Sequence, residues 1–162
     1  MALVIEDGSI VAGANSYVSV SDFTTFLDDR GLEFSGAGPD EEQCLTIAMD
    51  YLETRSYLGY RVDDAQELSF PRSGIYIDGV LVADDAIHKD LKLAQMEVAY
   101  AVDQGNNPLS TLGRETKKEK VGDIEVEYFD KAKESSDLRA VEARLSRFTK
   151  TGRDNTVALM RV

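Results

Sequence analysis

An alternating stretch centred on Gly122-Asp123, from residue 116 to residue 129, most constrains how this chain can fold. A Gly-first pair is typical of the type II′ turn that joins two antiparallel strands. The turn sets the register, so we expect Val121 to lie opposite Ile124, with the flanking residues paired outward from there. Side chains alternate across each strand, so the ribbon must have two different faces.

The two faces of this predicted hairpin differ in chemistry. One carries only charged side chains: Lys118, Lys120, Glu125 and Glu127. The other is mainly apolar and is edged by two charged residues, Lys117 and Glu119; its apolar residues are Val121, Ile124, Val126 and Tyr128. Cross-strand pairs stabilise a ribbon by roughly 0.2–1 kcal/mol each, which is too little to hold an isolated hairpin in water. The apolar face must therefore be covered by the chain's own core or by a neighbouring subunit.

The rest of the chain is typical of a mainly α protein with β-hairpins. Its 162 residues are enough for one domain with its own core. Helical periodicity and capping signals predict helices from about Ser19 or Ser21 to Gly31, and over about 40–57, 85–104 and 135–148. We therefore expect a small bundle of three to four helices, a projecting hairpin (about 116–129) and a short hairpin (about 75–82). Residues 60–74 are expected to be irregular. Residues 1–150 would form the domain and residues 151–162 a C-terminal tail.

The charge and the cysteine content of the chain limit the classes of function that it can have. The formal net charge is −12, from 18 basic and 30 acidic residues. Proteins that grip nucleic acid through phosphates need clustered Lys and Arg, and the densest basic stretches here, 114–120 and 139–150, are interleaved with acids. DNA gripping is disfavoured, whereas an acidic wall that DNA passes is compatible. Cys44 is the one cysteine, which excludes an internal disulfide. We expect neither a signal peptide nor a membrane span.

The chain has few residues suited to catalysis, so we expect no enzyme, no cofactor and no metal site. His88, the one histidine, is expected to cap a helix or lie on the surface. Cys44 falls on the apolar stripe of a predicted helix and has no accompanying histidine. Adjacent acidic pairs such as Asp63-Asp64 and Asp84-Asp85 are typical of solvated helix ends and turns. Phosphate-binding, nucleophile-elbow and CxxC motifs do not occur.

A set of aromatic residues offers a second hypothesis. Aromatic side chains can stack on the bases of single-stranded DNA, and the candidates in the middle of the chain are Tyr51, Tyr57, Tyr60, Phe70 and Tyr76. Packing in the core or in an interface is the more common use of such residues, and we favour it here.

Unpaired apolar edges indicate an assembly protein. The apolar hairpin face and the β-prone end, Thr156–Val162, both need covering. Three motifs then resemble a known family over about residues 3–148: Glu6–Val20, Leu68–Gly74 and Lys120–Tyr128 occur in the order found in a group of tailed-bacteriophage proteins labelled DnaT-like single-stranded-DNA-binding proteins. By fold, that group is similar to the head–tail connector (adaptor, or head-completion) proteins of long-tailed phages.

The resemblance implies a structural virion protein that forms a ring, commonly dodecameric, in the phage neck after synthesis in the host cytoplasm. Its partners would be copies of itself, the portal protein and the next neck or tail protein (stopper or tail terminator), with DNA only as passing cargo. The resemblance implies a portal-facing segment, Thr156, Val157, Ala158, Leu159 and Met160. It also implies a subunit-interface hairpin, with Ile124, Val126 and Tyr128 on the side facing a neighbour or the core. The residues of this hairpin set are Lys118, Lys120, Ile124, Glu125, Val126, Glu127 and Tyr128. The alternative is a single-stranded-DNA-binding replication protein.

Overall fold

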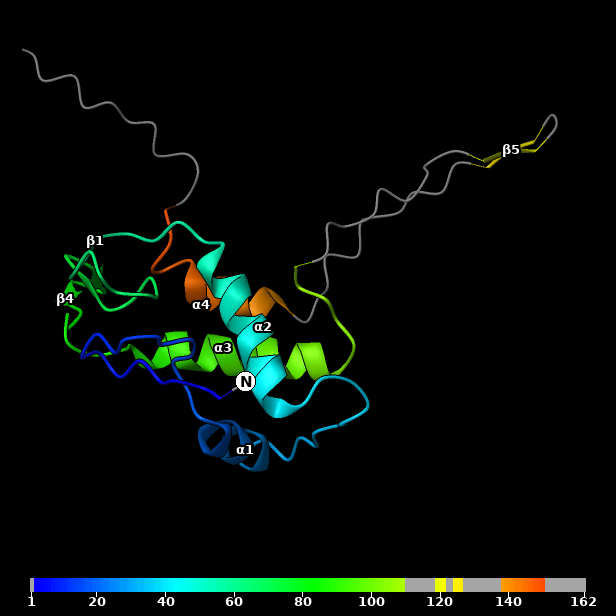
Figure 1. Cartoon of the computed structure of the whole chain (residues 1–162). Coiled ribbons are helices and arrows are strands. Elements are labelled where there is room, and N and C mark those ends of the chain that lie inside the picture. The colour runs from blue at the N-terminus through cyan, green and yellow to red at the C-terminus, as the bar shows by residue number, and fades with distance from the viewer. Residues whose placement is uncertain (1, 110–118, 122–123, 127–137, 151–162) are drawn as a thin grey trace, which may run out of the picture.

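A computed structural model describes residues 2–109, 119–121, 124–126 and 138–150. Within these residues, four helices pack together and short antiparallel hairpins lie outside them (Figure 1). The helices are α1 (Val20–Asp28), α2 (Glu41–Glu53), α3 (Lys89–Asp103) and α4 (Arg139–Leu145). Helix α3 is central, since α2 and α4 both pack on it and α1 packs on α2. The predicted class, mainly α with β-hairpins, is confirmed. None of the described helices is long and apolar enough to cross a membrane.

Two capping boxes fix the starts of the first two helices. The Ser19 side chain accepts a hydrogen bond from the backbone of Asp22, and Asp22 accepts one from the backbone of Ser19. Asp40 and Gln43 make the same reciprocal pair at the start of α2. Each box satisfies two backbone N–H groups that have no partner within the helix. Both helix starts agree with the sequence prediction.

Helix α2 is shorter than predicted because its last expected residues pair with the end of α4 instead. Tyr57 forms an antiparallel bridge with Thr149. The Leu58 N–H donates to Phe148 O at 2.7 Å, and the Lys150 N–H donates to Ser56 O at 2.9 Å. The backbone of residues 56–58 is therefore extended, and α2 ends at Glu53.

Helix α3 begins at Lys89 rather than near Asp85, with His88 as its N-cap. The His88 Nδ1 accepts a hydrogen bond from the Asp90 N–H at 3.2 Å, so the predicted capping role is confirmed. Asp85 instead lies against the N-terminal loop. A Cβ on Gly8 would approach Asp85 O to 2.2 Å, and this close contact keeps the residues around Asp85 out of the helix.

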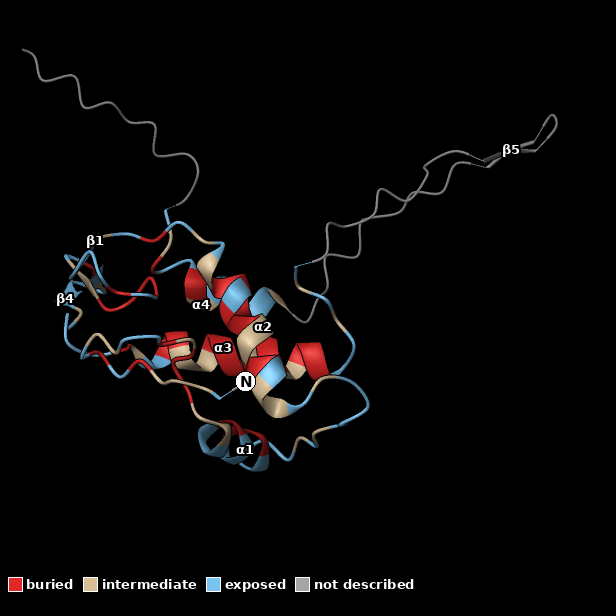
Figure 2. Cartoon of the chain, viewed as in Figure 1, coloured by how far each residue is buried: buried red, intermediate tan, exposed pale blue. Residues whose placement is uncertain are grey.

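The core lies between the facing sides of α2 and α3 and is closed by α1 and α4 (Figure 2). The predicted stripe of α2 is buried except for Ser56, which is exposed and lies beyond the end of the helix. The predicted face of the last helix is buried except for the half-buried Leu138. The buried residues of the two faces are Cys44, Leu45, Ala48, Met49, Leu52, Val141, Leu145 and Phe148. At the centre of this apolar region is Gln95, which is fully buried. Its amide accepts from the Tyr17 N–H at 3.0 Å and donates to Ser16 Oγ at 2.8 Å and to Leu45 O at 3.0 Å. Gln95 thus joins the N-terminal segment, α2 and α3.

The described strands form three two-stranded antiparallel sheets. These are β1 (Tyr60–Arg61) with β2 (Arg72–Ser73), β3 (Tyr76–Ile77) with β4 (Val80–Leu81), and β5 (Glu119–Val121) with β6 (Ile124–Val126). The short hairpin and the register of β5 and β6, with Val121 opposite Ile124, agree with the sequence prediction. The pairing of β1 with β2 corrects the expectation of an irregular segment over residues 60–74.

Replacing Gln95 with Leu should lower the free energy of unfolding by about 3 kcal/mol, because the Tyr17 N–H would be left buried without a partner and the Leu45 carbonyl would lose the hydrogen bond that it accepts from Gln95. Urea unfolding followed by circular dichroism measures the change. Gln104→Leu, on an exposed position just after the same helix, is the control and should shift stability by less than about 0.5 kcal/mol. Equal losses in the two variants would contradict the role of Gln95.

Alkaline unfolding should depend on Tyr51. Burial, followed by its hydrogen bond to Glu142, raises the pKa of Tyr51 to about 12, from about 10 in an unfolded chain. The unfolded chain therefore releases this proton first, so stability is full below pH ~10 and falls as pH rises toward ~12. We expect Tyr51→Phe to flatten the decline of the urea midpoint above pH ~10. Tyr60→Phe, on an exposed ring, should leave the decline unchanged; a similar flattening there would refute the assignment.

Candidate nucleic-acid interface

The five candidate stacking residues separate into two groups. Tyr51, Tyr57 and Phe70 are buried in the core, and Tyr57 packs edge-on against Phe70 with ring centroids 4.9 Å apart. By contrast, Tyr60 is 77% exposed and Tyr76 is 64% exposed. The preference for core packing is therefore confirmed for the first group. Only the second group can present a ring face to a ligand.

Tyr60 is held outward by two glycines. Gly59 has a φ of +67°, and a Cβ there would approach Ser73 O to 2.3 Å, so the backbones of β1 and the end of β2 meet closely. Gly74, with a φ of +76°, leaves space for the Tyr60 ring, which would lie 3.9 Å from a Cβ at that position. The sequence signal for this pairing is the mirrored order Gly-Tyr-Arg at 59–61 and Arg-Ser-Gly at 72–74.

Tyr76 is carried by the adjacent hairpin. The turn residues Asp78 and Gly79 have φ values of +52° and +81°, which is the pattern of a type I′ hairpin turn. The two hairpins share one anchor, Ile75, which is 1% exposed and lies beside Gly59. Both hairpins consequently project from the same end of the helical bundle, near the labels β1 and β4 in Figure 1.

Two side chains, Arg72 in β2 and Gln66 in the 62–71 loop, hold β1 against β2. Arg72 donates to Leu58 O at 2.7 Å and to Gly59 O at 2.8 Å. Gln66 is buried; it accepts from the Val62 N–H at 3.0 Å and donates to Pro71 O at 3.1 Å. Burial, and secondly the charge of Arg61, lowers the pKa of Arg72. Arg72 is thus a structural residue whose guanidinium is occupied by backbone carbonyls.

Arg61 is an exposed cation at this end of the molecule. It lies directly opposite Arg72 in the ladder, an unfavourable arrangement for like charges. One guanidinium nitrogen donates to Gln66 O at 3.2 Å, and within the described residues no ion pair includes Arg61. An anion beside Arg61 would relieve the repulsion between the two arginines. The sequence reading missed this residue because it treated residues 60–74 as irregular.

The first two sequence motifs meet beneath this surface. The Tyr17 hydroxyl accepts from the Phe70 N–H at 3.1 Å, and the Glu53 carboxylate accepts from the Ser69 N–H at 3.0 Å and from Ser69 Oγ at 2.7 Å. Burial, and then the charge of Glu53, raises the pKa of Tyr17 well above its usual value. Residues 16–20 and 68–74 therefore act as the support of the two exposed hairpins.

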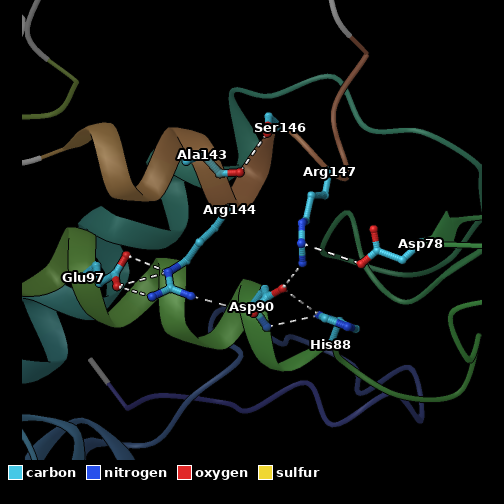
Figure 3. Close-up of polar contacts among 8 residues, drawn as sticks. All are labelled: Asp78, His88, Asp90, Glu97, Ala143, Arg144, Ser146 and Arg147. Atoms are coloured by element: carbon cyan, nitrogen blue, oxygen red, sulfur yellow. Dashed lines mark hydrogen bonds and ion pairs between the residues drawn. The ribbon is translucent and has the colours of Figure 1, made fainter.

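An ion-pair network connects the short hairpin to the helices (Figure 3). The Arg144 guanidinium nitrogens lie 3.0 Å from a carboxylate oxygen of Glu97 and 3.8 Å from one of Asp90. The guanidinium nitrogens of Arg147 lie 3.5 Å from a carboxylate oxygen of the same Asp90 and 3.7 Å from one of Asp78, at the tip of the β3–β4 turn. The guanidinium of Arg147 thus bridges α3 and the hairpin that carries Tyr76.

The residues considered for catalysis include a buried thiol and two exposed acidic pairs. Burial, with a smaller effect of Asp103, raises the pKa of the Cys44 thiol to about 11, which keeps it protonated and unreactive. The pairs Asp63-Asp64 and Asp84-Asp85 are exposed, as expected. Among the described side chains, no three His, Cys, Asp or Glu residues could together hold a metal ion.

Several predicted site residues cannot be assigned contacts. Of the hairpin set, Lys120, Ile124, Glu125 and Val126 lie in β5 and β6, whose backbone register alone is described. The others lie outside the described residues: Lys118, Glu127, Tyr128, Thr156, Val157, Ala158, Leu159 and Met160. The division of the apolar hairpin face between core and neighbour, and the boundary between domain and tail at residue 150, stay predictions.

Comparison with known proteins identifies a family. A family model described as "Putative DnaT-like ssDNA binding protein" matches residues 1–162. No curated protein and no solved structure shows significant similarity to the chain. The family match extends over the whole chain, including the two exposed hairpins and the residues beyond 150.

The match corrects the expectations drawn from the phage connectors. Because the family is described by single-stranded-DNA binding, the assignment to head–tail connectors is wrong. The same finding overturns the structural role in a dodecameric ring, the virion-neck location, and the portal and neck or tail proteins as partners. DNA as mere passing cargo is corrected too, and the portal-facing assignment of Thr156–Met160 loses its basis. The alternative, single-stranded-DNA binding, is the better supported interpretation. With the match covering residues 1–162, the chain belongs to this DnaT-like family.

Proposed function

We propose that this protein binds single-stranded DNA through the end of the molecule formed by β1–β4, without catalysing a reaction. The observation that carries the proposal is the exposure of two tyrosine rings, Tyr60 and Tyr76, on hairpins that share the buried anchor Ile75. Membership of a family described by ssDNA binding supports it. The role that fits is that of a replication accessory protein acting on unpaired DNA.

Stacking explains why the strand must be single. A ring such as that of Tyr60 offers a flat apolar face to water, and an unpaired base can cover it. Base–aromatic stacking contributes about 1–3 kcal/mol per base, and it tolerates any sequence because every base has a π-face. Bases in a duplex are already stacked and paired, so they are not available to Tyr60 or Tyr76.

Arg61 supplies a contact for the backbone of the strand. It adjoins Tyr60 in the same strand, and its neighbour across the ladder is another arginine. A phosphate beside Arg61 would neutralise an unfavourable like-charge pair while accepting charge-assisted hydrogen bonds. Because successive side chains of a strand point to opposite faces, Arg61 lies on the other face of the ribbon from Tyr60, and the phosphate at Arg61 would belong to a nucleotide further along the bound strand.

The acidic balance of the chain determines the mode of binding. With a net charge of −12, the protein has little long-range attraction for a polyanion. Its affinity must come mainly from base stacking, and the ionic contribution is limited to a few local contacts. Binding is therefore expected to be modest in strength and weakly dependent on salt, in contrast with proteins that neutralise many phosphates.

Removing either exposed ring should weaken binding. We expect Tyr60→Ala and Tyr76→Ala each to lower the affinity for a fluorescein-labelled oligothymidylate about tenfold, as loss of one stacked base implies. Fluorescence anisotropy measures the change, with circular dichroism to establish that the variants fold. The matched controls Tyr60→Phe and Tyr76→Phe keep the ring and should bind nearly as well as the parent. Unchanged affinity in both alanine variants would refute the proposed site.

Removing the Arg61 charge should change the salt dependence. For Arg61→Gln, we expect the slope of log K against log salt concentration to fall in magnitude by about 0.7, the value for one phosphate contact on a single strand. Titrations at several salt concentrations measure the slope. Arg139→Gln, at an exposed position at the start of α4, is the control and should leave the slope unchanged. A uniform effect of both variants would show that Arg61 makes no local contact.

A further inference from the structure

Arg147 is held between two carboxylates with very different surroundings (Figure 3). Asp90 is 7% exposed and lies in the first turn of α3, where Arg144 and His88 also approach it. The Asp78 side chain is 80% exposed and lies at the tip of the β3–β4 turn. The Arg147 side chain itself is 51% exposed. The guanidinium therefore faces a buried carboxylate on its inner side and is open to exchange on its outer side.

The outer contact is weak in geometry. The distance from Arg147 to the Asp78 carboxylate is 3.7 Å, which is beyond the 2.7–3.2 Å of a hydrogen bond and makes it an ion pair only. Exposed ion pairs of this kind contribute little, because both charges remain hydrated when they separate. By contrast, arginine binds phosphate oxygens with two parallel charge-assisted hydrogen bonds. A phosphate is thus the better partner for the outer side of Arg147.

The position of this pair relates it to the proposed DNA site. Asp78 follows Tyr76 by two residues in the same hairpin, and Arg147 forms an ion pair with Asp78 at the tip of that hairpin. A strand that stacks a base on Tyr76 has to run its negatively charged backbone past the exposed carboxylate of Asp78. The carboxylate and an incoming phosphate would then compete for one guanidinium.

We propose that the Asp78 carboxylate competes with DNA for Arg147. In the free protein it occupies the position at Arg147 that a DNA phosphate would take, and when single-stranded DNA binds, a phosphate replaces it. This inference rests on the proposed function. It adds a second phosphate contact, at Arg147, and a carboxylate, Asp78, that weakens phosphate binding there. In the free protein, the Asp78 carboxylate neutralises Arg147, so isolated anions gain little there. A strand whose base is already stacked on Tyr76 displaces Asp78 because its phosphate is held close to Arg147.

The exchange is tested by removing the competitor. Asp78→Asn keeps the turn, because Asn adopts positive φ readily in a type I′ hairpin. We expect it to bind a labelled oligothymidylate about three times more tightly than the parent, the scale expected for losing an exposed ion pair. Asp84→Asn, an exposed acid between β4 and α3, removes the same unit of charge without touching Arg147 and should change the affinity less.

A second pair of variants separates competition from a general charge effect. In an Arg147→Met background, Asp78→Asn should give no more improvement than Asp84→Asn, because the contested guanidinium is gone. Two outcomes would overturn this inference and leave the proposed function standing. One is an equal effect of Asp78→Asn and Asp84→Asn on affinity in the parent background, and the other is a full gain in affinity from Asp78→Asn in the Arg147→Met background. Absence of oligothymidylate binding in the parent and in Asp78→Asn would overturn both the inference and the proposed function.

Discussion

The fold depends on one buried amide. Gln95 has no access to water, yet its side chain makes hydrogen bonds to the N-terminal segment and to α2 from its place on α3. A polar group so deep in an apolar core is tolerated only when its partners are in place. The packing of α2 on α3 and the docking of Tyr17 are thereby coupled, since a shift of either would leave donors or acceptors unpaired.

Two sets of hydrogen bonds connect Gln95 and its partners to the exposed end of the molecule. Tyr17, positioned by Gln95, accepts a hydrogen bond from Phe70, and Glu53 at the end of α2 accepts two from Ser69. These contacts fix the 68–71 segment, from which β2 and the shared anchor Ile75 follow. Thus the hairpins that expose Tyr60 and Tyr76 are positioned by the core, although neither ring is part of it.

The sequence was informative where local chemistry decides the structure. Capping residues and acidic first turns located the starts of the first two helices, where the structure has capping boxes at Ser19 and Asp40, and the Gly122-Asp123 signal predicted the register of β5 and β6. Where distant residues decide, prediction failed. Strands β1 and β2 have two residues each and no alternating pattern, and their pairing depends on Arg72 and Gln66 reaching backbone carbonyls. Likewise, Tyr57 is buried and Tyr60 exposed because residues 56–58 pair with residues 148–150. The net charge also led to the prediction that the protein does not grip DNA. A net charge is a sum over the whole chain, so it does not reveal a local cation such as Arg61.

The close approach at Gly59 has a consequence for how two bases would be bound. Because a Cβ there would approach Ser73 O to 2.3 Å and Ile75 Cγ1 to 2.8 Å, the backbones of β1, the end of β2 and the shared anchor lie in close contact. In the proposed function, the two exposed rings would act as a bivalent receptor. Once one base is seated, the next arrives at a high effective concentration set by the short sugar–phosphate tether. Little conformational entropy is then lost in the protein on binding, so even two modest contacts can hold a strand together.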